Sequence, residues 1–446
     1  MHNSDTIAAI STALGEGGIA IIRVSGSSAA DVAARILKRK KFEISGKLYL
    51  TRLIDNDGNI IDRVLAVNFT KPKTYTGEDI VEIHTHGGIF VARLCLELLL
   101  KNGARLAEPG EFTRRAFLNG RIDLSQAEGV LGVIKSRSIE ALRASARTLT
   151  GELSESIKKI HDEILKLQSS VEIQLDFPEG ETLDNFDIIP ELKKIICEIK
   201  ELLSRCSAGM IFNNGARAVI AGSPNVGKSS LLNALLGKKR AIVTDIAGTT
   251  RDIIEDNIII NGLPVIFADT AGLRNSDDII EAEGVRLASE AVRKSDICLY
   301  VVDSSREITQ EEIDYINSLE NENTIIIFNK SDLKSKINDI NKPCEKIHVS
   351  AKNQTGIEEL KNLVYKTALK NSVSDSGLNV SVGQLENIRE SLGALNDAYK
   401  SAKNFTGEDI TADMLNSARL SLMRVLGLDA GDELLDSMFS RFCVGK

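Results

Sequence analysis

The sequence has no hydrophobic run of about 18 residues, the length that a membrane-spanning helix requires. Its first residues, MHNSDTIAAI, have no basic start followed by a long apolar stretch, so we expect no signal peptide. The six cysteines are scattered and include no C-x-x-C pair. This spacing argues against a zinc ribbon or a disulfide framework and suits the reducing cytosol.

An excess of basic residues is also missing, because 55 lysines and arginines face 63 aspartates and glutamates for a net charge of −8. Any RNA contact must therefore come from a local patch or from a partner protein. One candidate for such a patch is the segment 135–147, with Lys135, Arg137, Arg143 and Arg147, although a charged helix face is usually only solvated. The length of 446 residues, 43% of them hydrophobic, predicts a soluble globular chain of two to four domains.

The hydrophobic pattern divides the chain into segments of different fold class. Strand-like runs at residues 18–26, 64–70 and 79–85, with helical spacing between them, predict an α+β domain over residues 1–118. Residues 119–210 have helical spacing, interrupted by an acidic loop that ends at Pro190.

Strands return in residues 211–372, where they alternate with helices and predict a doubly wound α/β sheet. Asn261 and Gly262 form a hairpin turn within it. Residues 373–446 are again helical. Because domain ends commonly lie close together, the α/β unit can be inserted into one discontinuous helical domain. The sequence thus predicts a multidomain chain.

A phosphate-binding loop lies in the inserted unit: Gly222-Ser-Pro-Asn-Val-Gly227-Lys228-Ser229 follows a strand and opens a helix. The glycines let backbone N–H groups turn toward phosphate oxygens. Lys228 can then reach the β- and γ-phosphates, and the Ser229 hydroxyl can bind Mg²⁺. These residues predict nucleotide binding.

The base of the nucleotide is predicted from Asn329-Lys-Ser-Asp332, which follows another strand. The Asp332 carboxylate can accept two N–H groups of guanine, whereas adenine would leave it unpaired at a cost of roughly 1–3 kcal/mol. Ser350-Ala-Lys352, at the next strand end, can support the guanine ring. The sequence therefore predicts GTP as the ligand.

Two further segments belong to the γ-phosphate side of this site. Asp269 begins Asp-Thr-Ala-Gly, in which the carboxylate is suited to the second shell of Mg²⁺ and the Gly272 N–H can meet the γ-phosphate. Either Thr249 or Thr250 can complete the Mg²⁺ shell, and spacing alone does not choose between them. Leu273 stands where many regulatory GTPases have a glutamine that orients water, and it cannot form a hydrogen bond.

The phosphate loop, TDIAGTTRD and DTAGLR together resemble the MnmE, or TrmE, family of bacterial tRNA modification GTPases. The resemblance extends to YTGEDIVEIHTHGG, PGEFTRRAFLNGRIDLSQAE and the final RFCVGK, so it covers the whole chain. It implies that K⁺ replaces an arginine finger, held by Asn225, Thr244, Ile246 and Thr249, which leaves Thr250 for Mg²⁺. It also implies that the K⁺ loop becomes ordered when two GTPase domains meet.

The same resemblance gives Glu281 the role of orienting the attacking water through a second water. Read without the family, Glu281 belongs to a solvated acidic helix start. The predicted GTP-contacting residues are Asn225, Val226, Gly227, Lys228, Ser229, Ser230, Thr244, Asp245, Ile246, Ala247, Gly248, Thr249, Thr250, Asp269, Thr270, Ala271, Gly272, Asn329, Lys330, Ser331, Asp332, Ser350, Ala351 and Lys352.

For the N-terminal domain, the resemblance implies the folate-binding-type fold of the aminomethyltransferases, which binds a formyl-tetrahydrofolate-type one-carbon donor and forms a homodimer. Arg23, Glu82, Arg121 and the C-terminal Lys446 match its ligand positions, where their charges suit an anionic pterin conjugate. Cys443 is a candidate for a direct chemical role, with a small buried thiol as the alternative.

The predicted function is GTP hydrolysis that drives the addition of a carboxymethylaminomethyl-type group to C5 of the tRNA wobble uridine. The family implies a flavin-dependent partner, MnmG (GidA), and a cytoplasmic location. Two other classes remain open from the residues: a ribosome-associated GTPase switch, and a folate-dependent transferase with a vestigial nucleotide site. The N-terminal domain disfavours the former, and intact Lys228, Ser229 and Asp332 disfavour the latter.

Overall fold

The computed structural model describes residues 5–39, 41–42, 44–176, 187–237, 256–267, 292–293, 295–319, 323–337, 340, 342–369, 376–404, 407–428 and 430–446. The chain divides into two compact units, Met1–Leu131 with Arg419–Lys446, and Gly132–Ala418. Within the described ranges, no helix is both long enough and apolar enough to cross a membrane.

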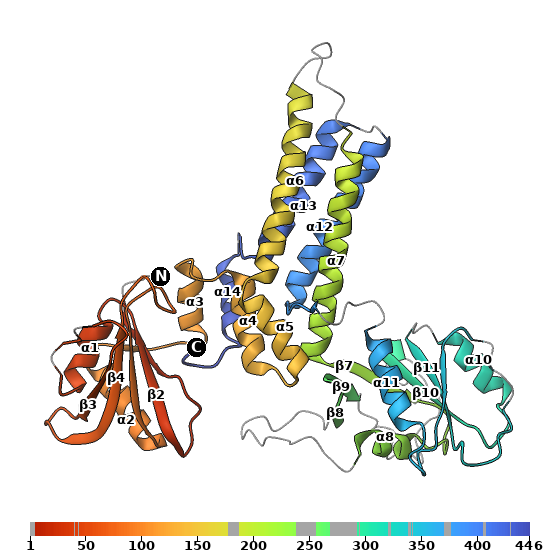
Figure 1. The fold of residues 1–446 in the computed structure, drawn as a ribbon, viewed down its shortest axis with the longest axis horizontal. Helices are drawn as coiled ribbons and strands as arrows, with labels where there is room; N and C mark the ends of the chain where they lie inside the picture. The colour runs from red at the N-terminus through yellow and green to blue at the C-terminus, as the bar shows by residue number, and fades with distance from the viewer. Residues whose placement is uncertain are drawn as a thin grey trace. The chain divides into compact units, whose positions relative to one another are not determined.

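The first unit is built on a six-stranded sheet with the order β3-β4-β5-β2-β1-β6 (Figure 1). Neighbouring strands are antiparallel, except that β1 and β6 are parallel. Ala20, Ile22 and Val24 of β2 alternate onto the face where α1 and α2 complete a buried core. The bounds are β1 Ile7–Ile10, β2 Gly17–Ser25, α1 Ala29–Ile36, β3 Leu48–Ile54, β4 Ile60–Phe69, β5 Ile80–Gly87, α2 Ile89–Lys101, β6 Arg105–Leu106 and α3 Glu111–Leu118.

The sequence predicts β2, β4 and β5 but misses the other three strands. β1 has four residues and β6 has two, which is too short for a period to be recognised. β3 lies at the sheet edge, where Leu48 and Leu50 are 50% and 60% exposed. Its apolar residues therefore occupy both faces and hide the alternation.

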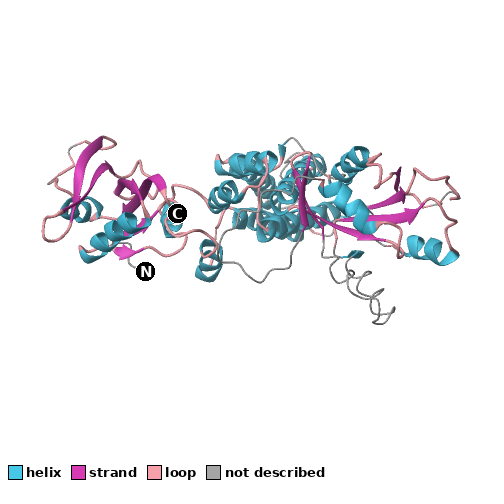
Figure 2. Cartoon of the chain, turned by 90° about the horizontal axis from the view of Figure 1, so that it is seen from below, coloured by secondary structure: helices cyan, strands magenta, loops and turns pink. Residues whose placement is uncertain are grey.

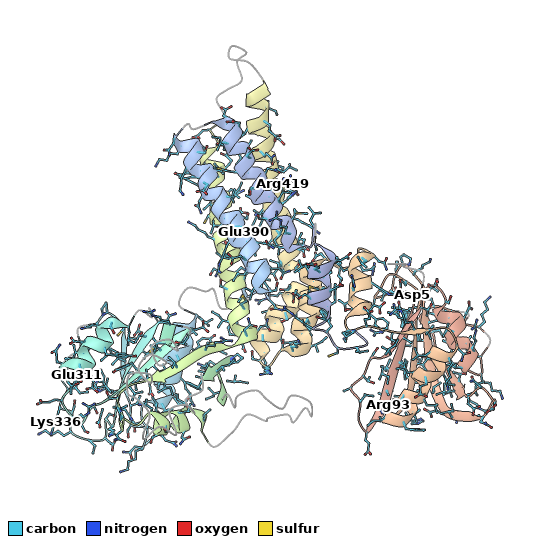
Figure 3. All side chains as sticks on the ribbon, turned by 180° about the vertical axis from the view of Figure 1, so that it is seen from behind. Asp5, Arg93, Glu311, Lys336, Glu390 and Arg419 are labelled. Atoms are coloured by element: carbon cyan, nitrogen blue, oxygen red, sulfur yellow. The ribbon has the colours of Figure 1, made fainter. Side chains whose placement is uncertain are left out.

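A buried arginine joins α3 to the start of this sheet. The Arg115 guanidinium donates to Asp5 Oδ1 at 2.7 Å and to Glu111 Oε1 at 2.9 Å, and it pairs with Glu78 at 3.1 Å. Asp5, labelled in Figure 3, also pairs with Arg105 at 2.7 Å. Each buried charge thus has an opposite charge beside it, as burial requires.

The helical elements agree with the predicted spacing. In α6 the buried residues Leu153, Ile157, Ile160, Ile164 and Leu167 recur every three or four positions. α7 packs against both α6 and α12. In Figure 2 the described helices are cyan and the described strands are magenta; the strands belong to two sheets, of which the second is described below. The helices are α4 Leu124–Lys135, α5 Ile139–Leu149, α6 Glu152–Asp176, α7 Ile189–Asn214, α12 Val382–Asn404, α13 Glu408–Val425 and α14 Asp432–Phe439.

The second unit contains the predicted α/β sheet, with the strand order β12-β11-β10-β7-β9-β8. All neighbours are parallel except the β8–β9 hairpin. Parallel strands end at one edge, so the loops after β7, β10 and β11 meet there. The elements are β7 Ala216–Ala221, α8 Lys228–Leu236, β8 Asp256–Ile260, β9 Leu263–Phe267, β10 Ile297–Asp303, α10 Gln310–Ser318, β11 Thr324–Asn329, β12 Glu345–His348 and α11 Ile357–Ala368.

The chain leaves the helical part and returns to it at neighbouring points. The Leu378 N–H donates to Arg205 O at 3.1 Å, and Arg205 Nε donates to Ser376 O at 2.9 Å. Gly209 lies so close to this returning segment that a Cβ on it would be 2.0 Å from Leu378 O. The α/β sheet is therefore an insertion between α7 and α12.

Candidate nucleotide site

The phosphate loop follows β7 and ends at the first turn of α8, as predicted. Gly222 and Gly227 have φ of 138° and 96°, values that favour glycine. Space also requires glycine, because a Cβ on Gly222 would lie 2.3 Å from Val301 O, and one on Gly227 would lie 2.3 Å from Asn329 Nδ2. The backbone can therefore turn its N–H groups inward only with glycine at these two positions.

Lys228 is the first residue of α8, and its ammonium group closes over the loop. Its Nζ donates to Gly222 O at 2.6 Å and to Ser223 O at 2.9 Å. Burial lowers the pKa of Lys228, because it removes water from the charged ammonium group. Phosphate oxygens at this position would compensate that charge. The Ser229 side chain follows on the exposed side of the same turn, where its hydroxyl can reach a cation beside the phosphates.

The base-recognition motif is bonded directly to the phosphate loop. Asn329 Nδ2 donates to Val226 O at 2.9 Å, and Asn329 Oδ1 accepts from the Ala351 N–H at 3.1 Å. Lys330 has a left-handed φ of 63°, and its Nζ donates to Asn225 O at 3.1 Å. These bonds unite three sequence-predicted segments at one sheet edge.

The carboxylate of Asp332 is held in place by the next strand end. Asp332 Oδ1 accepts from Ser350 Oγ at 2.6 Å, and the Ser350 hydroxyl accepts in turn from the Asn353 N–H at 3.1 Å. The hydrogen bond from Ser350 lowers the pKa of Asp332, so the carboxylate is ionised at neutral pH. An ionised, oriented carboxylate can accept two parallel N–H bonds from guanine.

Sequence reasoning missed Asp303, the last residue of β10. Its Oδ2 accepts from Lys330 Nζ at 2.5 Å, and with this lysine beside it the pKa of Asp303 is lowered, although burial opposes the shift. It also missed Glu312 of α10, which accepts from Ser223 of the phosphate loop at 2.5 Å. A polar residue at the end of the strand DICLYVVD was the available signal for Asp303.

Several predicted residues lie outside the described part of the chain, including Leu273, the proposed catalytic Glu281 and most of the predicted K⁺ ligands. Of that K⁺ set the structure describes Asn225, which has a φ of 61°. The others outside the description are Thr244, Asp245, Ile246, Ala247, Gly248, Thr249, Thr250, Asp269, Thr270, Ala271 and Gly272.

A second group of predicted residues lies in the first unit. Arg23 and Glu82 are paired across β2 and β5, with Arg23 Nη2 2.8 Å from Glu82 Oε1. The Arg23 guanidinium carbon is 5.7 Å from the Tyr75 ring centroid and 5.8 Å from that of Phe112. The Arg23 cation, the Glu82 carboxylate and the half-buried Tyr75 ring can bind a flat heterocycle, whereas the Phe112 ring is fully buried.

The C-terminal segment is anchored on the same sheet. The Gly110 N–H donates to Cys443 O at 3.5 Å, and Ser11 Oγ donates to Gly445 O at 3.1 Å. Cys443 is exposed, so the alternative of a buried thiol is wrong. Arg121 is also exposed, and its Nε donates to Thr74 O at 3.2 Å. Among the described residues, no hydrogen bond or ion pair joins Arg121 or Lys446 to Glu82.

The contact of Asn329 with the phosphate loop and that of Asp332 with Ser350 define a phosphate-loop nucleotide-binding domain with a carboxylate for the base. The TrmE N-terminus model matches residues 6–121, and the MnmE helical domain model matches residues 124–443. The tRNA modification GTPase MnmE of Carboxydothermus hydrogenoformans is 42% identical over 99% of both chains. That of Clostridioides difficile is 42% identical over all of both chains.

Among solved structures, the G domain of the T. maritima FeoB iron transporter is 23% identical over 34% of this chain and 98% of its own, with a TM-score of 0.27. Aquifex aeolicus Era is 24% identical over 40% of this chain and 66% of its own, with a TM-score of 0.24. The chain belongs to the MnmE family of tRNA modification GTPases. It is accordingly a GTP hydrolase.

Proposed function

We propose that this chain is a K⁺-dependent GTPase that is activated when two of its GTPase domains meet. The proposal starts from Leu273, which cannot orient water for attack on the γ-phosphate. Asn225 lies at the phosphate loop, its carbonyl oxygen occupied by Lys330 and its side-chain amide without a hydrogen bond in the described part of the site. An amide oxygen is a suitable ligand for a hard cation.

The residues of this chain have separate tasks in the proposed reaction. Lys228 and the backbone of the phosphate loop bind and orient the β- and γ-phosphates. Ser229 and Thr250 would hold Mg²⁺, and Asn225, Thr244, Ile246 and Thr249 would hold K⁺. The bound cations supply positive charge where negative charge develops in the transition state. Asp332 selects guanine.

Glu281 is proposed to orient the attacking water through a second water. Replacing it by alanine removes an interaction that exists only in the transition state, so kcat should fall by about 100-fold or more while the affinity for GTP is kept. Steady-state hydrolysis and titration with a non-hydrolysable GTP analogue measure the two quantities separately. An unchanged kcat would exclude Glu281 from the reaction.

We propose that the N-terminal domain, residues 1–118, has the folate-binding-type fold, binds a formyl-tetrahydrofolate-type donor and forms a homodimer. Arg23 and Glu82, with Arg121 and Lys446, would bind the donor. Residues 119–210 and 373–446 would form the helical domain around the GTPase domain, residues 211–372. Titration with tetrahydrofolate tests the site: Glu82→Ala should abolish binding that wild type shows, and undiminished binding would contradict the assignment.

With a flavin-dependent partner, MnmG (GidA), the chain is proposed to install a carboxymethylaminomethyl-type group at C5 of the tRNA wobble uridine in the cytoplasm. Membership of the tRNA modification GTPase family over the full chain carries this proposal. The test is mass spectrometry of tRNA nucleosides from a strain that lacks the chain, complemented with wild type or with Lys228→Ala. The modified uridine should be restored by wild type alone. If the strain that lacks the chain contains the same modified wobble uridine as the strain complemented with wild type, the proposal is overturned.

A further inference from the structure

The β8–β9 hairpin connects the two γ-phosphate segments of the GTPase domain. β8 begins at Asp256, six residues after Thr250. β9 ends at Phe267, and only Ala268 separates it from Asp269, the first residue of Asp-Thr-Ala-Gly. Each strand has five residues and pairs with the other throughout. Because paired strands are stiff, a displacement at the turn is transmitted to both segments.

The turn of this hairpin is Asn261-Gly262, with φ of 49° and 83°. Asn261 Nδ2 donates to Asn362 Oδ1 of α11 at 2.8 Å, which holds one side of the turn within the GTPase domain. The other side faces the helical part of the chain. A Cβ on Gly262 would lie 1.8 Å from Glu140 Oε2 and 2.2 Å from its carboxyl carbon.

Glu140 is the second residue of α5, directly after the N-cap Ser138 and Ile139. Its Oε2 is buried and accepts no hydrogen bond from any residue that the structure describes. The next residue, Ala141, is 1% exposed and belongs to the same hydrophobic cluster as Ile260 and Leu263 at the two ends of the turn. The N-terminal turn of α5 and the hairpin therefore share one core.

We propose that Glu140 is a positioning residue for GTP hydrolysis. Its carboxylate contacts the β8–β9 turn and prevents the turn from moving closer to α5. The contact limits the positions of the turn, and through β8 and β9 it limits those of the segments that contain Thr250 and Asp269. Fewer non-productive arrangements of these segments raise the rate of the chemical step. The inference rests on the proposed roles of those two residues.

The buried Oε2 of Glu140, which has no donor among the described residues, makes this contact suited to change rather than to permanence. Desolvation of the charge opposes the docked position, and the shared hydrophobic core favours it. By linkage, any change at the nucleotide that shifts the turn also acts on α5, and any change at α5 acts on the turn. The helical domain can in this way respond to the nucleotide.

The test uses the full chain and a double-mutant cycle. Gly262→Ala cannot keep the contact, whether the turn or the carboxylate moves, and Glu140→Ala removes it from the other side. We expect each variant to lower kcat by about threefold or more, and the double variant to be no slower than the slower single variant. GDP affinity should stay within about twofold of wild type, which a general loss of structure would not allow.

Two matched controls separate this effect from its alternatives. Gly237→Ala tests a methyl group at a positive φ, 61°, with open space around it. Leu142→Ala tests truncation on the exposed side of α5, where Leu142 is 43% exposed. Both controls should keep the wild-type kcat. Rate losses that multiply in the double variant, or an unchanged kcat for Glu140→Ala, would overturn the inference.

The same experiment keeps the inference apart from the proposed cation mechanism. If wild type turns over equally in K⁺ and Na⁺, the cation proposal fails, while the comparison of variants still decides the role of Glu140. If Gly262→Ala lowers the melting temperature more than Gly237→Ala does, the comparison of Glu140→Ala with Leu142→Ala decides alone, since both of these substitutions lie in α5 and not in the GTPase domain itself.

Discussion

Single residues at the nucleotide site show how geometry selects residue type. Gly227 is required because Asn329 Nδ2 occupies the space of a Cβ, and Asn329 is required because it bonds both Val226 and Ala351. The motif residues could be predicted from sequence, since each type has one chemical use at that spacing. The ion pair between Asp303 and Lys330 could not be predicted, because the sequence does not show that the ends of β10 and β11 lie side by side.

At the same scale we predict the effect of Asp332→Asn. An asparagine presents one N–H₂ group toward the guanine N–H donors, so two favourable bonds are replaced by at least one unfavourable contact. The affinity for GDP should fall by about 10- to 100-fold, which corresponds to roughly 1–3 kcal/mol. Fluorescent-nucleotide titration measures this loss. An affinity within a factor of two of wild type would show that Asp332 does not contact the base.

Among the elements, α10 contributes an unexpected support to the phosphate loop. Its N-cap Thr309 and Glu312 form a capping box, and the same Glu312 carboxylate accepts from Ser223 and pairs with Arg306. Burial by itself raises the pKa of Glu312, but the hydrogen bonds from Arg306, Ser223 and Thr309 have the larger, opposite effect. The resulting pKa is about 2, below the ordinary value of 4.5. The capping box could be read from TQEE, whereas the bond to Ser223 depends on the fold.

This pKa predicts how stability depends on pH. A carboxylate whose folded pKa is about 2 and whose ordinary value is 4.5 stabilises the fold fully above pH 4.5 and loses that contribution as pH falls toward 2. Glu312→Gln should therefore be less stable than wild type at pH 7, by on the order of 1 kcal/mol, with the difference shrinking in acid. Urea unfolding from pH 7 to pH 3 measures it.

Glu311 provides the control for that prediction, because it is the exposed neighbour of Glu312 on the same helix (Figure 3). Glu311→Gln should follow wild type at every pH. A constant difference between Glu312→Gln and wild type across the range would mean that the carboxylate contributes no pH-dependent stability.

Two helical glycines predict opposite effects of the same substitution. A Cβ on Gly209 of α7 would lie 2.0 Å from Leu378 O, a backbone atom that cannot move aside alone, so Gly209→Ala should destabilise the helical domain by about 1–3 kcal/mol. Gly393 of α12 has nothing within 4 Å, so Gly393→Ala should stabilise it by about 0.5–1 kcal/mol. The denaturant midpoint of each variant shows whether its stability has risen or fallen. If both substitutions changed the stability in the same direction, the packing described for these two glycines would be contradicted.

For the whole molecule, the sequence pattern predicted an α/β unit at residues 211–372 inserted into a helical domain, because the hydrophobic period changes at both ends of that unit. It could not predict that α14 and the end of α13 group with the N-terminal sheet, since that depends on contacts between distant segments. For the same reason the meeting of Gly262 with Glu140 had no signature in the sequence.

The central claim at this scale is the proposal that a K⁺ ion takes the place of an arginine finger, while Glu281 does the work of the missing glutamine. The most direct measurement is the GTP turnover of the full chain in KCl and in NaCl at one ionic strength. We predict that turnover in NaCl is lower by about tenfold or more, because the smaller ion fits the ligand set poorly and leaves transition-state charge uncompensated. Equal turnover in the two salts would contradict the account.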